Sequence, residues 1–451
     1  MNTNKLVAAL VAALSVGSSF AAGTTTTYAV GNQINIAGST ALANQSVPAV
    51  HAYATNNGYT LVAADKMDPL TNSAANVTLA NLQGTKIALW TKVVTATNGS
   101  KITITTNAIN LHQIGSEGGT LIAASKTTGK FLPLSATGKV NADATGAGGQ
   151  GYVPSSSTTV DANATITFSD VDQAVGRFNT AKTAPVKCVA LTEVAKLAAI
   201  NFAIVAPTNF PASNITDRQL QALLNAGSLP LSFFTGNPAD STNGVFATGR
   251  DIDSGTRVLT LTESGVGALA SVNQYVWDNT GKMLNLSVSN SVNGISYTAG
   301  NGGHFSGGDL CVAVGASCGA ITNGAALNTN YTGASYLLGY TSSKDLIGKG
   351  GNTKALSYNG VAPYATSAYS GFQTNNNVIA NGTYSLWSVG RLYKNTANAP
   401  KGTDKTVIDA AATAIANTIL SSSTSDLGYG YTKLTDLNVT RASEGATIFK
   451  K

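Results

Sequence analysis

Apolar and polar positions follow two different spacings along the chain, and each spacing predicts one kind of element. Short apolar runs that are rich in β-branched residues or alternate with polar positions are typical of strands. They occupy residues 34–37, 60–63, 87–96, 102–109, 164–168, 198–205, 245–247, 336–340 and 383–393. Apolar residues at helical spacing predict helices over residues 41–54, 217–224 and 404–420. Strands that alternate with helices indicate an α/β fold.

Some segments modify this simple pattern. Pro48 lies inside residues 41–54, so that helix begins or bends there. The nearly continuous apolar run 198–205 predicts a strand buried on both faces, which makes it a candidate to cross between two lobes. Residues 126–165 are rich in Gly, Ser, Thr and Ala and predict an exposed excursion. Residues 281–333 show little periodicity and predict loops and short hairpins.

Turns rich in Gly, Ser or Asp stand at the ends of several elements. Gly38-Ser39-Thr40 follows the first strand, and Ser169-Asp170 ends the strand at 164–168. Gly115-Ser116-Glu117-Gly118-Gly119 opens a helical stretch at residues 120–124. Each of these turns is a weak signal alone, because ordinary turns have the same composition.

The stretch from Gly249 to Thr256 is the strongest candidate for a binding site. It follows the strand at 245–247 and precedes an amphipathic helix, for which Asp253 or Ser254 is a natural N-cap. The free N–H groups at such a helix start bind anions, and Arg250 adds a permanent positive charge beside them. An ordinary capped helix after a surface strand has the same pattern, so this stretch alone leaves both interpretations open.

Length and composition indicate a two-lobed, secreted protein. The 451 residues exceed the usual size of one domain. Only 11% of the residues are charged, while 43% are hydrophobic, which excludes a disordered chain. The net charge is +6, but Lys and Arg are scattered singly, so we expect no nucleic-acid partner.

The first residues predict export. Lys5 precedes an apolar run at residues 6–16 and a small-x-small cleavage pattern, Ser19-Phe20-Ala21. We expect a signal peptide over residues 1–21 and a periplasmic or secreted protein. No Cys follows the cleavage pattern, so a lipid anchor is not expected.

Three cysteines fit an oxidising compartment. Cys311 and Cys318 are close enough in sequence to close a small disulfide, whereas Cys188 is expected to be a buried free thiol. Three Cys and three His show no metal-ligand spacing, and neither a metal nor a cofactor is expected.

Taken in chain order, these turns resemble those of the phosphate-binding proteins of bacterial phosphate ABC transporters. The similar segments are Ala37-Gly38-Ser39-Thr40, Gly115-Ser116-Glu117-Gly118-Gly119, Ser169-Asp170 and the Arg-x-x-x-Ser-Gly-Thr motif from Arg250 to Thr256. Flanking segments agree, namely Ala203-Ile204-Val205, Asn214-Ile215-Thr216, Leu338-Gly339-Tyr340 and residues 381–386. The resemblance covers residues 34–450 with gaps.

The resemblance implies a two-lobed periplasmic-binding-protein fold with a hinge, in which mixed sheets are flanked by helices. Residues 22–198 with 384–451 would form the first lobe, and residues 199–383 the second. The resemblance implies a monomer that captures inorganic phosphate between the lobes for uptake or sensing, without catalysis. The membrane subunits of an ABC transporter are a further implied partner. The implied ligand-binding residues are Thr40, Ala41, Ser116, Asp170, Arg250, Ser254, Gly255 and Thr256, and Asp251 or Asp253 would orient Arg250.

The implied site has one acidic member with a specific role. Phosphate at neutral pH keeps a P–OH group that can donate a hydrogen bond to the Asp170 carboxylate, whereas sulfate has no proton to donate and would be repelled. Asp172 competes for this role, because an ungapped alignment from Phe168 favours it; we choose Asp170 because it keeps Ser and Asp adjacent.

The sequence also departs from the family pattern. The segment between Ser116 and Asp170 and the region 281–333 are longer than usual, and Glu117 places a carboxylate beside a binding serine. Alternative functions are capture of another oxyanion, or a cell-surface or structural role on the same fold. A secreted phosphatase is disfavoured, because no His-paired Ser, metal cluster or nucleophile elbow is found.

Overall fold

The computed structural model describes most of the chain. The described residues are 25–65, 82, 84–140, 142–143, 153–154, 159–179, 189–277, 283–286, 291–292, 295–296, 302–316, 331–349, 351–366, 373–422 and 430–451. The expected signal peptide, Cys188 and Cys318 lie outside these ranges. Cys311 is a buried, free thiol. Among the described residues, no helix combines the length and the apolar character that crossing a membrane requires.

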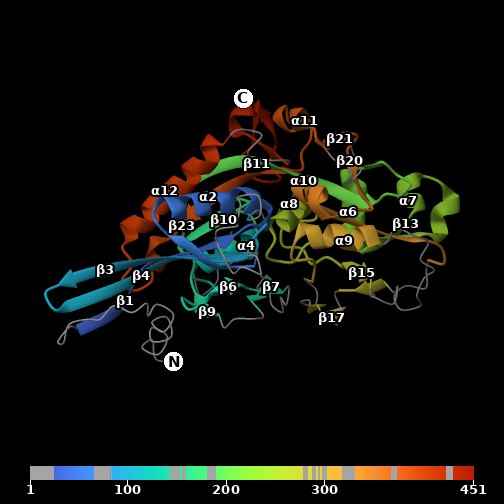
Figure 1. Cartoon of the computed structure of the whole chain (residues 1–451). Helices are drawn as coiled ribbons and strands as arrows, with labels where there is room; N and C mark the ends of the chain where they lie inside the picture. The colour runs from blue at the N-terminus through green and yellow to red at the C-terminus, as the bar shows by residue number, and fades with distance from the viewer. Residues whose placement is uncertain are drawn as a thin grey trace.

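A large mixed sheet forms the backbone of the molecule, and its first half is built around β1 (Figure 1). Strand β1 runs parallel to β4 on one side and to β10 on the other. Strand β3 continues the sheet antiparallel to β4, followed by β2 and β6. The bounds are β1 (Thr25–Gly38), β2 (Thr60–Ala64), β3 (Ile87–Asn98), β4 (Lys101–Gln113), β6 (Gly138–Lys139) and β10 (Ile166–Ser169).

The second half of the sheet is organised around β19. This strand pairs antiparallel with β11 and parallel with β14, which in turn pairs with β13. Strand β20 pairs with the end of β11 and with β12. The bounds are β11 (Thr192–Pro207), β12 (Asn214–Ile215), β13 (Ser228–Pro230), β14 (Gly244–Ala247), β19 (Ser335–Ser342) and β20 (Thr353–Tyr358).

One long strand, β11, belongs to both halves. Its first part pairs with β23 (Trp387–Lys394), and its last part pairs with β19 and β20. The partner changes between Asn201 and Phe202, within the apolar run that the sequence marks as a crossing strand. Strand β23 also pairs with β10 and so connects β11 to the first half of the sheet. β24 (Tyr431–Thr432) covers β11 at the same place.

Helices flank the sheet and bury its apolar faces, as an α/β fold requires. Next to the first half, α2 packs against α12, and α4 packs against β1 and β10 (Figure 1). The second half carries α6, α8, α9 and α10. The bounds are α2 (Ala43–Asn56), α4 (Ser116–Ala123), α6 (Asp217–Ala226), α7 (Ser232–Thr235), α8 (Gly255–Glu263), α9 (Gly307–Ala316), α10 (Ser343–Lys349), α11 (Asn376–Ala380) and α12 (Lys405–Ser421).

Small two-stranded sheets and single-turn helices complete the described structure. The strand pairs are β5 (Gly129–Phe131) with β9 (Val160–Ala162), β7 (Ala142–Asp143) with β8 (Val153–Pro154), β15 (Tyr275–Trp277) with β16 (Met283–Asn285), β17 (Ser291–Val292) with β18 (Ile295–Ser296), β21 (Tyr364–Thr366) with β22 (Gln373–Thr374), and β25 (Val439–Thr440) with β26 (Phe449–Lys450). The 3-10 turns are η1 (Thr40–Leu42), η3 (Pro238–Thr242), η5 (Thr396–Asn398) and η6 (Leu434–Asp436).

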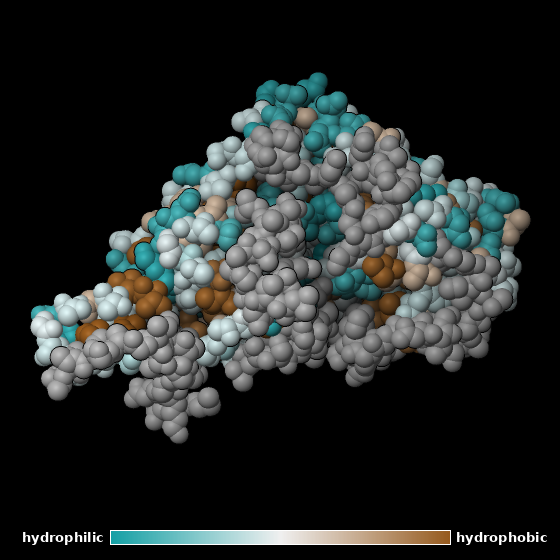
Figure 2. Space-filling view, in the orientation of Figure 1, coloured by the Kyte–Doolittle hydropathy of each residue, from teal (hydrophilic) through white to brown (hydrophobic). Residues whose placement is uncertain are grey.

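A ribbon made of β1, β4 and β3 projects from the first half (Figure 1). Four large apolar side chains stay exposed on it, Tyr28, Val30, Val93 and Val94. Figure 2 shows apolar surface over this part of the molecule. The other ends of β1 and β3 are buried in the core, and apolar residues continue along these strands into the exposed ribbon.

The structure differs from the sequence prediction in four places. The segment 126–165, predicted as an exposed excursion, buries Leu132, Ala136 and Val140 in a core cluster. Helix α9 lies inside the region 281–333, which was expected to hold only loops and hairpins. Helix α4 begins at Ser116 rather than Thr120, so its glycines lie in the helix; a methyl group at Gly119 would lie 2.6 Å from the Gly38 Cα atom of β1. Strand β23 begins at Trp387, four residues later than expected.

Candidate functional site

Three strands of the first half end side by side. Gly38, the last residue of β1, stands opposite Gln113 of β4 and Phe168 of β10. Because the three strands are parallel, the turns that follow them meet at one edge of the sheet. These turns hold Thr40, Ser116 and Asp170, three of the residues implied as ligand-binding.

The first turn, η1, is closed by its own residues. Ser39 caps it, because its side chain accepts a hydrogen bond from the Ala41 N–H at 3.1 Å. The Tyr431 hydroxyl donates to the Ala41 carbonyl. The Ala41 N–H, which the resemblance implies as a ligand donor, is therefore engaged within the turn. Thr40 faces the second half, where its Oγ1 accepts from Arg250 Nη2 at 3.2 Å.

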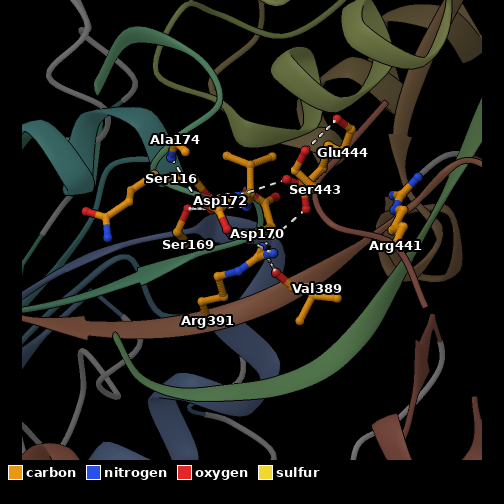
Figure 3. Close-up of polar contacts among 12 residues, drawn as sticks. Ser116, Ser169, Asp170, Asp172, Ala174, Val389, Arg391, Arg441, Ser443 and Glu444 are labelled. Atoms are coloured by element: carbon orange, nitrogen blue, oxygen red, sulfur yellow. Dashed lines mark hydrogen bonds and ion pairs between the residues drawn. The ribbon is translucent and has the colours of Figure 1, made fainter. Parts of the chain in front are cut away.

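Ser116 and Asp170 form a buried pair. Ser116 Oγ donates to Asp170 Oδ1 and accepts from the Asp170 N–H at 2.9 Å (Figure 3). Burial raises the pKa of Asp170, while the Ser116 hydrogen bond and the positive charge of Arg250 oppose that shift. Asp172 is instead engaged with Arg391 and with the Ala174 N–H, so Asp170 is the carboxylate that faces Ser116.

The start of α8 packs directly onto this pair. A methyl group at Gly255 would lie 1.8 Å from Asp170 Oδ1 and 2.9 Å from Ser116 Cβ, so only glycine fits there. Ser254 is the N-cap residue, but its side chain makes no capping hydrogen bond. The Thr256 hydroxyl is buried and has no hydrogen-bond partner among the described residues. The helix start thus brings free donors to the Ser116–Asp170 pair.

Arg250 is held in place by backbone carbonyls. Its Nε donates to the His304 carbonyl at 2.9 Å, and its Nη2 donates to the Phe305 carbonyl. Gly303 permits this close approach, since a methyl group there would lie 2.4 Å from the Arg250 carbonyl carbon. Arg257 supports the same loop by donating to the Arg250 carbonyl at 3.1 Å.

The expected support of Arg250 by an acidic neighbour takes a different form. In the described part of the chain, neither Asp251 nor Asp253 forms a salt bridge with Arg250. Asp253 pairs with Arg177. Burial and the nearby Asp253 raise the pKa of Asp251, and burial likewise raises the pKa of Asp253. The backbone carbonyls of His304 and Phe305 accept the guanidinium hydrogen bonds that an acidic side chain was expected to accept.

Glu117, the carboxylate that follows Ser116 in the sequence, is also buried at this site. It is 1% exposed, and burial raises its pKa to about 7 against the pull of Arg177. The Arg177 N–H donates to its Oε2 at 2.5 Å. Sequence reasoning missed Arg177, although the pair Gly176-Arg177 after a strand-end turn is a signal: Gly176 has φ +83°, and a methyl group there would lie 2.6 Å from Glu117 Oε2.

A second charged cluster surrounds Arg391 and includes Asp172, two residues after Asp170. Arg391 of β23 is buried and lies 3.2 Å from Glu444 and 3.4 Å from Asp172 (Figure 3). A third carboxylate, Glu193, also lies 3.4 Å from Arg391. Glu444 also accepts from the Asp172 N–H at 3.0 Å. This network fixes the turn after Asp170 to the strand that ties the two halves.

The two halves therefore meet at one small group of turns, which we call the junction: those holding Thr40, Ser116, Asp170, Arg250 and Gly255. It combines one guanidinium, hydroxyls, a helix N-terminus and one buried carboxylate that faces them. Guanidinium groups, hydroxyls and helix N-termini are groups that can donate hydrogen bonds to an oxyanion, and a carboxylate can accept one from a protonated anion. No group of three or more His, Cys, Asp or Glu side chains in the described ranges has the geometry of a metal site.

Comparisons with known proteins give matches among solved structures. No protein-family model matches the sequence, and no curated protein matches it. A putative phosphate ABC transporter substrate-binding protein with bound phosphate from Clostridium perfringens is 14% identical, with a TM-score of 0.41 over 89% of this chain and 100% of that one. An ABC-type phosphate transport receptor from Vibrio cholerae is 14% identical, with a TM-score of 0.40 over 89% and 99%. PstS from Borrelia burgdorferi is also 14% identical, with a TM-score of 0.32 over 88% and 95%.

Proposed function

We propose that this protein captures inorganic phosphate between two lobes without chemically changing it. The observation that carries the proposal is the contact between the start of α8 and the Ser116–Asp170 pair, with Arg250 reaching Thr40 from the same side. Hydrogen-bond donors from both halves of the sheet meet there, at a contact too close for any residue larger than glycine at position 255. A dianion taken out of water requires such a set, because an unpaired buried charge costs several kcal/mol.

The carboxylate of Asp170 favours binding of phosphate over binding of other oxyanions. A carboxylate among the donors repels an anion unless the anion carries a proton to donate. Hydrogen phosphate carries one at neutral pH, and sulfate does not. The raised pKa of Asp170 is consistent with a poorly solvated carboxyl group, for which a hydrogen bond to its ionised form gives a large benefit.

Calorimetric titration with phosphate and then sulfate tests this proposal. We expect micromolar or tighter binding of phosphate and at least about 10⁴-fold weaker binding of sulfate. Asp170→Asn should narrow that preference by about 100-fold or more, because the amide can donate to sulfate. Asp172→Asn is the matched control, since Asp172 faces Arg391, and it should leave the ratio unchanged. An unchanged ratio in Asp170→Asn would remove Asp170 from this role.

The remaining features of the proposal follow from the same arrangement. Residues 22–198 with 384–451 would move as one lobe and residues 199–383 as the other, with β11 and β23 as the hinge. The protein would act outside the cytoplasm after removal of residues 1–21 and would deliver phosphate to an ABC transporter or a sensor.

A further inference from the structure

Arg177 connects two turns that carry implied ligand residues, yet it is not one of those residues itself. Its Nη2 forms an ion pair with Asp253 Oδ1, and its Nε lies 3.9 Å from Glu117 Oε2. Glu117 follows Ser116, and Asp253 precedes Ser254. The Arg177 side chain is 25% exposed, whereas both carboxylates are buried.

The same two turns are in direct backbone contact. The Asp253 carbonyl accepts from the Glu117 N–H at 2.9 Å and from the Gly118 N–H at 3.4 Å. A methyl group at Gly115 would lie 2.3 Å from that carbonyl oxygen. Glu117 lies in α4, which packs on the first half of the sheet, and Asp253 lies just before α8, which packs on the second half. The two carboxylates therefore stay together only while the halves are together.

We propose that Arg177 is a positioning residue for anion capture, a latch that bridges Glu117 and Asp253 and thereby holds the two halves closed around the ligand. This inference rests on the proposed function. Arg177 does not touch the ligand in this role. It neutralises two carboxylates that closure brings together, and without it closure would bury an uncompensated negative pair.

The charges around the latch define its dependence on pH. Glu117 faces Arg177, Asp253 and Asp170, while Asp253 faces Arg177 and Asp251. When Glu117 or Asp253 is protonated, the repulsion disappears and the guanidinium is no longer needed. The raised pKa values of both groups place that protonation within reach of mildly acidic pH. Loss of Arg177 should therefore matter at pH 8 and matter little at pH 5.

The test compares phosphate affinity of the wild type and Arg177→Ala by calorimetry at pH 5 and pH 8. The quantity of interest is the ratio of the two dissociation constants at each pH, because the ionisation of phosphate itself cancels in that ratio. We expect Arg177→Ala to bind about 10-fold or more weakly at pH 8 and within about 3-fold of the wild type at pH 5. Arg218→Ala, an exposed arginine of α6, is the matched control and should stay at a ratio near one at both pH values.

Two further variants separate a latch from a general loss of structure. Arg177→Ala combined with Glu117→Gln removes one of the two repelling charges and should recover most of the affinity at pH 8. Arg177→Lys keeps the positive charge but lacks the forked guanidinium that contacts both carboxylates. Its phosphate affinity should lie between those of the wild type and Arg177→Ala. An Arg177→Ala ratio that is the same at pH 5 and pH 8, or absence of recovery in the double variant, would overturn the proposal.

The same experiments distinguish failure of the proposed phosphate binding from failure of the latch. If the wild type binds no phosphate at either pH, the ligand assignment is wrong, and the latch is judged from small-angle X-ray scattering of the ligand-free protein. Arg177→Ala should then have a larger radius of gyration than the wild type at pH 8 and the same radius at pH 5. Identical radii at both pH values would overturn the latch as well.

Discussion

Glu117 offers a direct test of the buried charges at the junction. Its carboxyl group is 1% exposed, and its pKa is raised from 4.5 to about 7 by burial. Glu117→Gln keeps the size of the side chain and the acceptor for the Arg177 N–H, but it removes the ionisable group. We expect this variant to be more stable than the wild type at pH 8 and equally stable at pH 4.5.

The sign and size of the effect follow from proton linkage. Below pH 4.5 Glu117 is protonated in both the folded and the unfolded state, so its ionisation does not lower the free energy of unfolding. As the pH rises toward 7, only the unfolded state releases the proton, and folding stability falls. A shift from 4.5 to about 7 at about 1.4 kcal/mol per unit corresponds to a cost of about 3 kcal/mol, which is fully present above pH 7.

Thermal unfolding from pH 4.5 to pH 8.5, in buffers without phosphate, measures this difference. The melting temperatures of Glu117→Gln and the wild type should coincide at the acidic end and separate by several degrees at the basic end. Glu193→Gln is the matched control, because Glu193 is 35% exposed, and it should follow the wild type to within about 1 kcal/mol. A constant difference at all pH values would refute the reasoning.

Two further predictions concern the neighbours of Asp170. Gly255→Ala should abolish measurable phosphate binding while circular dichroism stays unchanged, because its methyl group would lie 1.8 Å from Asp170 Oδ1; wild-type affinity in that variant would refute the contact. Arg391→Met should lower the free energy of unfolding by about 3–5 kcal/mol, because it leaves buried Glu444 unpaired. Adding Glu444→Gln should recover much of that loss in denaturant titrations, and no recovery would contradict pairing as the cause.

Sequence patterns predicted the elements that carry the candidate site well. The runs before Gly38, Ser169 and Arg250 are strands, and Gly255 begins a helix. Parallel strands place their following turns at one edge of a sheet, which explains the observed grouping. The sequence patterns themselves did not predict which strands are parallel, and the expectation that these turns meet came from the resemblance. These signals are local, and they depend on few residues.

Helix α9 shows where local signals fail. Its residues Leu310, Cys311 and Val314 are buried, and it contains three glycines, so it has neither a clear apolar stripe nor high helix propensity. Ser306 did mark its start, since its hydroxyl accepts from the Asp309 N–H at 3.1 Å, like the first residue of a capping box. The sequence analysis did not use this pattern, because the composition and weak periodicity of the region indicated loops.

The partners of each candidate side chain were beyond the sequence for a different reason. The carbonyls of His304 and Phe305 hold Arg250, and any residue type supplies a carbonyl. Ser39, rather than a ligand, accepts from the Ala41 N–H, and that choice depends on the turn geometry. Arg177 reaches Asp253 across 76 residues of sequence. Only the packing of the two halves brings these groups together.

The balance of charges at the junction explains why the donors there are mostly uncharged. The junction and the residues next to it together hold four buried carboxylates, Glu117, Asp170, Asp251 and Asp253, and three guanidiniums, Arg177, Arg250 and Arg257. Arg177 is engaged with Glu117 and Asp253, and Arg257 donates to backbone carbonyls. Arg250 donates to backbone carbonyls as well, but it also contacts a hydroxyl group, that of Thr40. A fully ionised site of this kind would resist a dianion. Capture of an oxyanion here therefore requires protons, held either by the ligand and shared with Asp170, or by carboxyl groups whose pKa values burial has already raised.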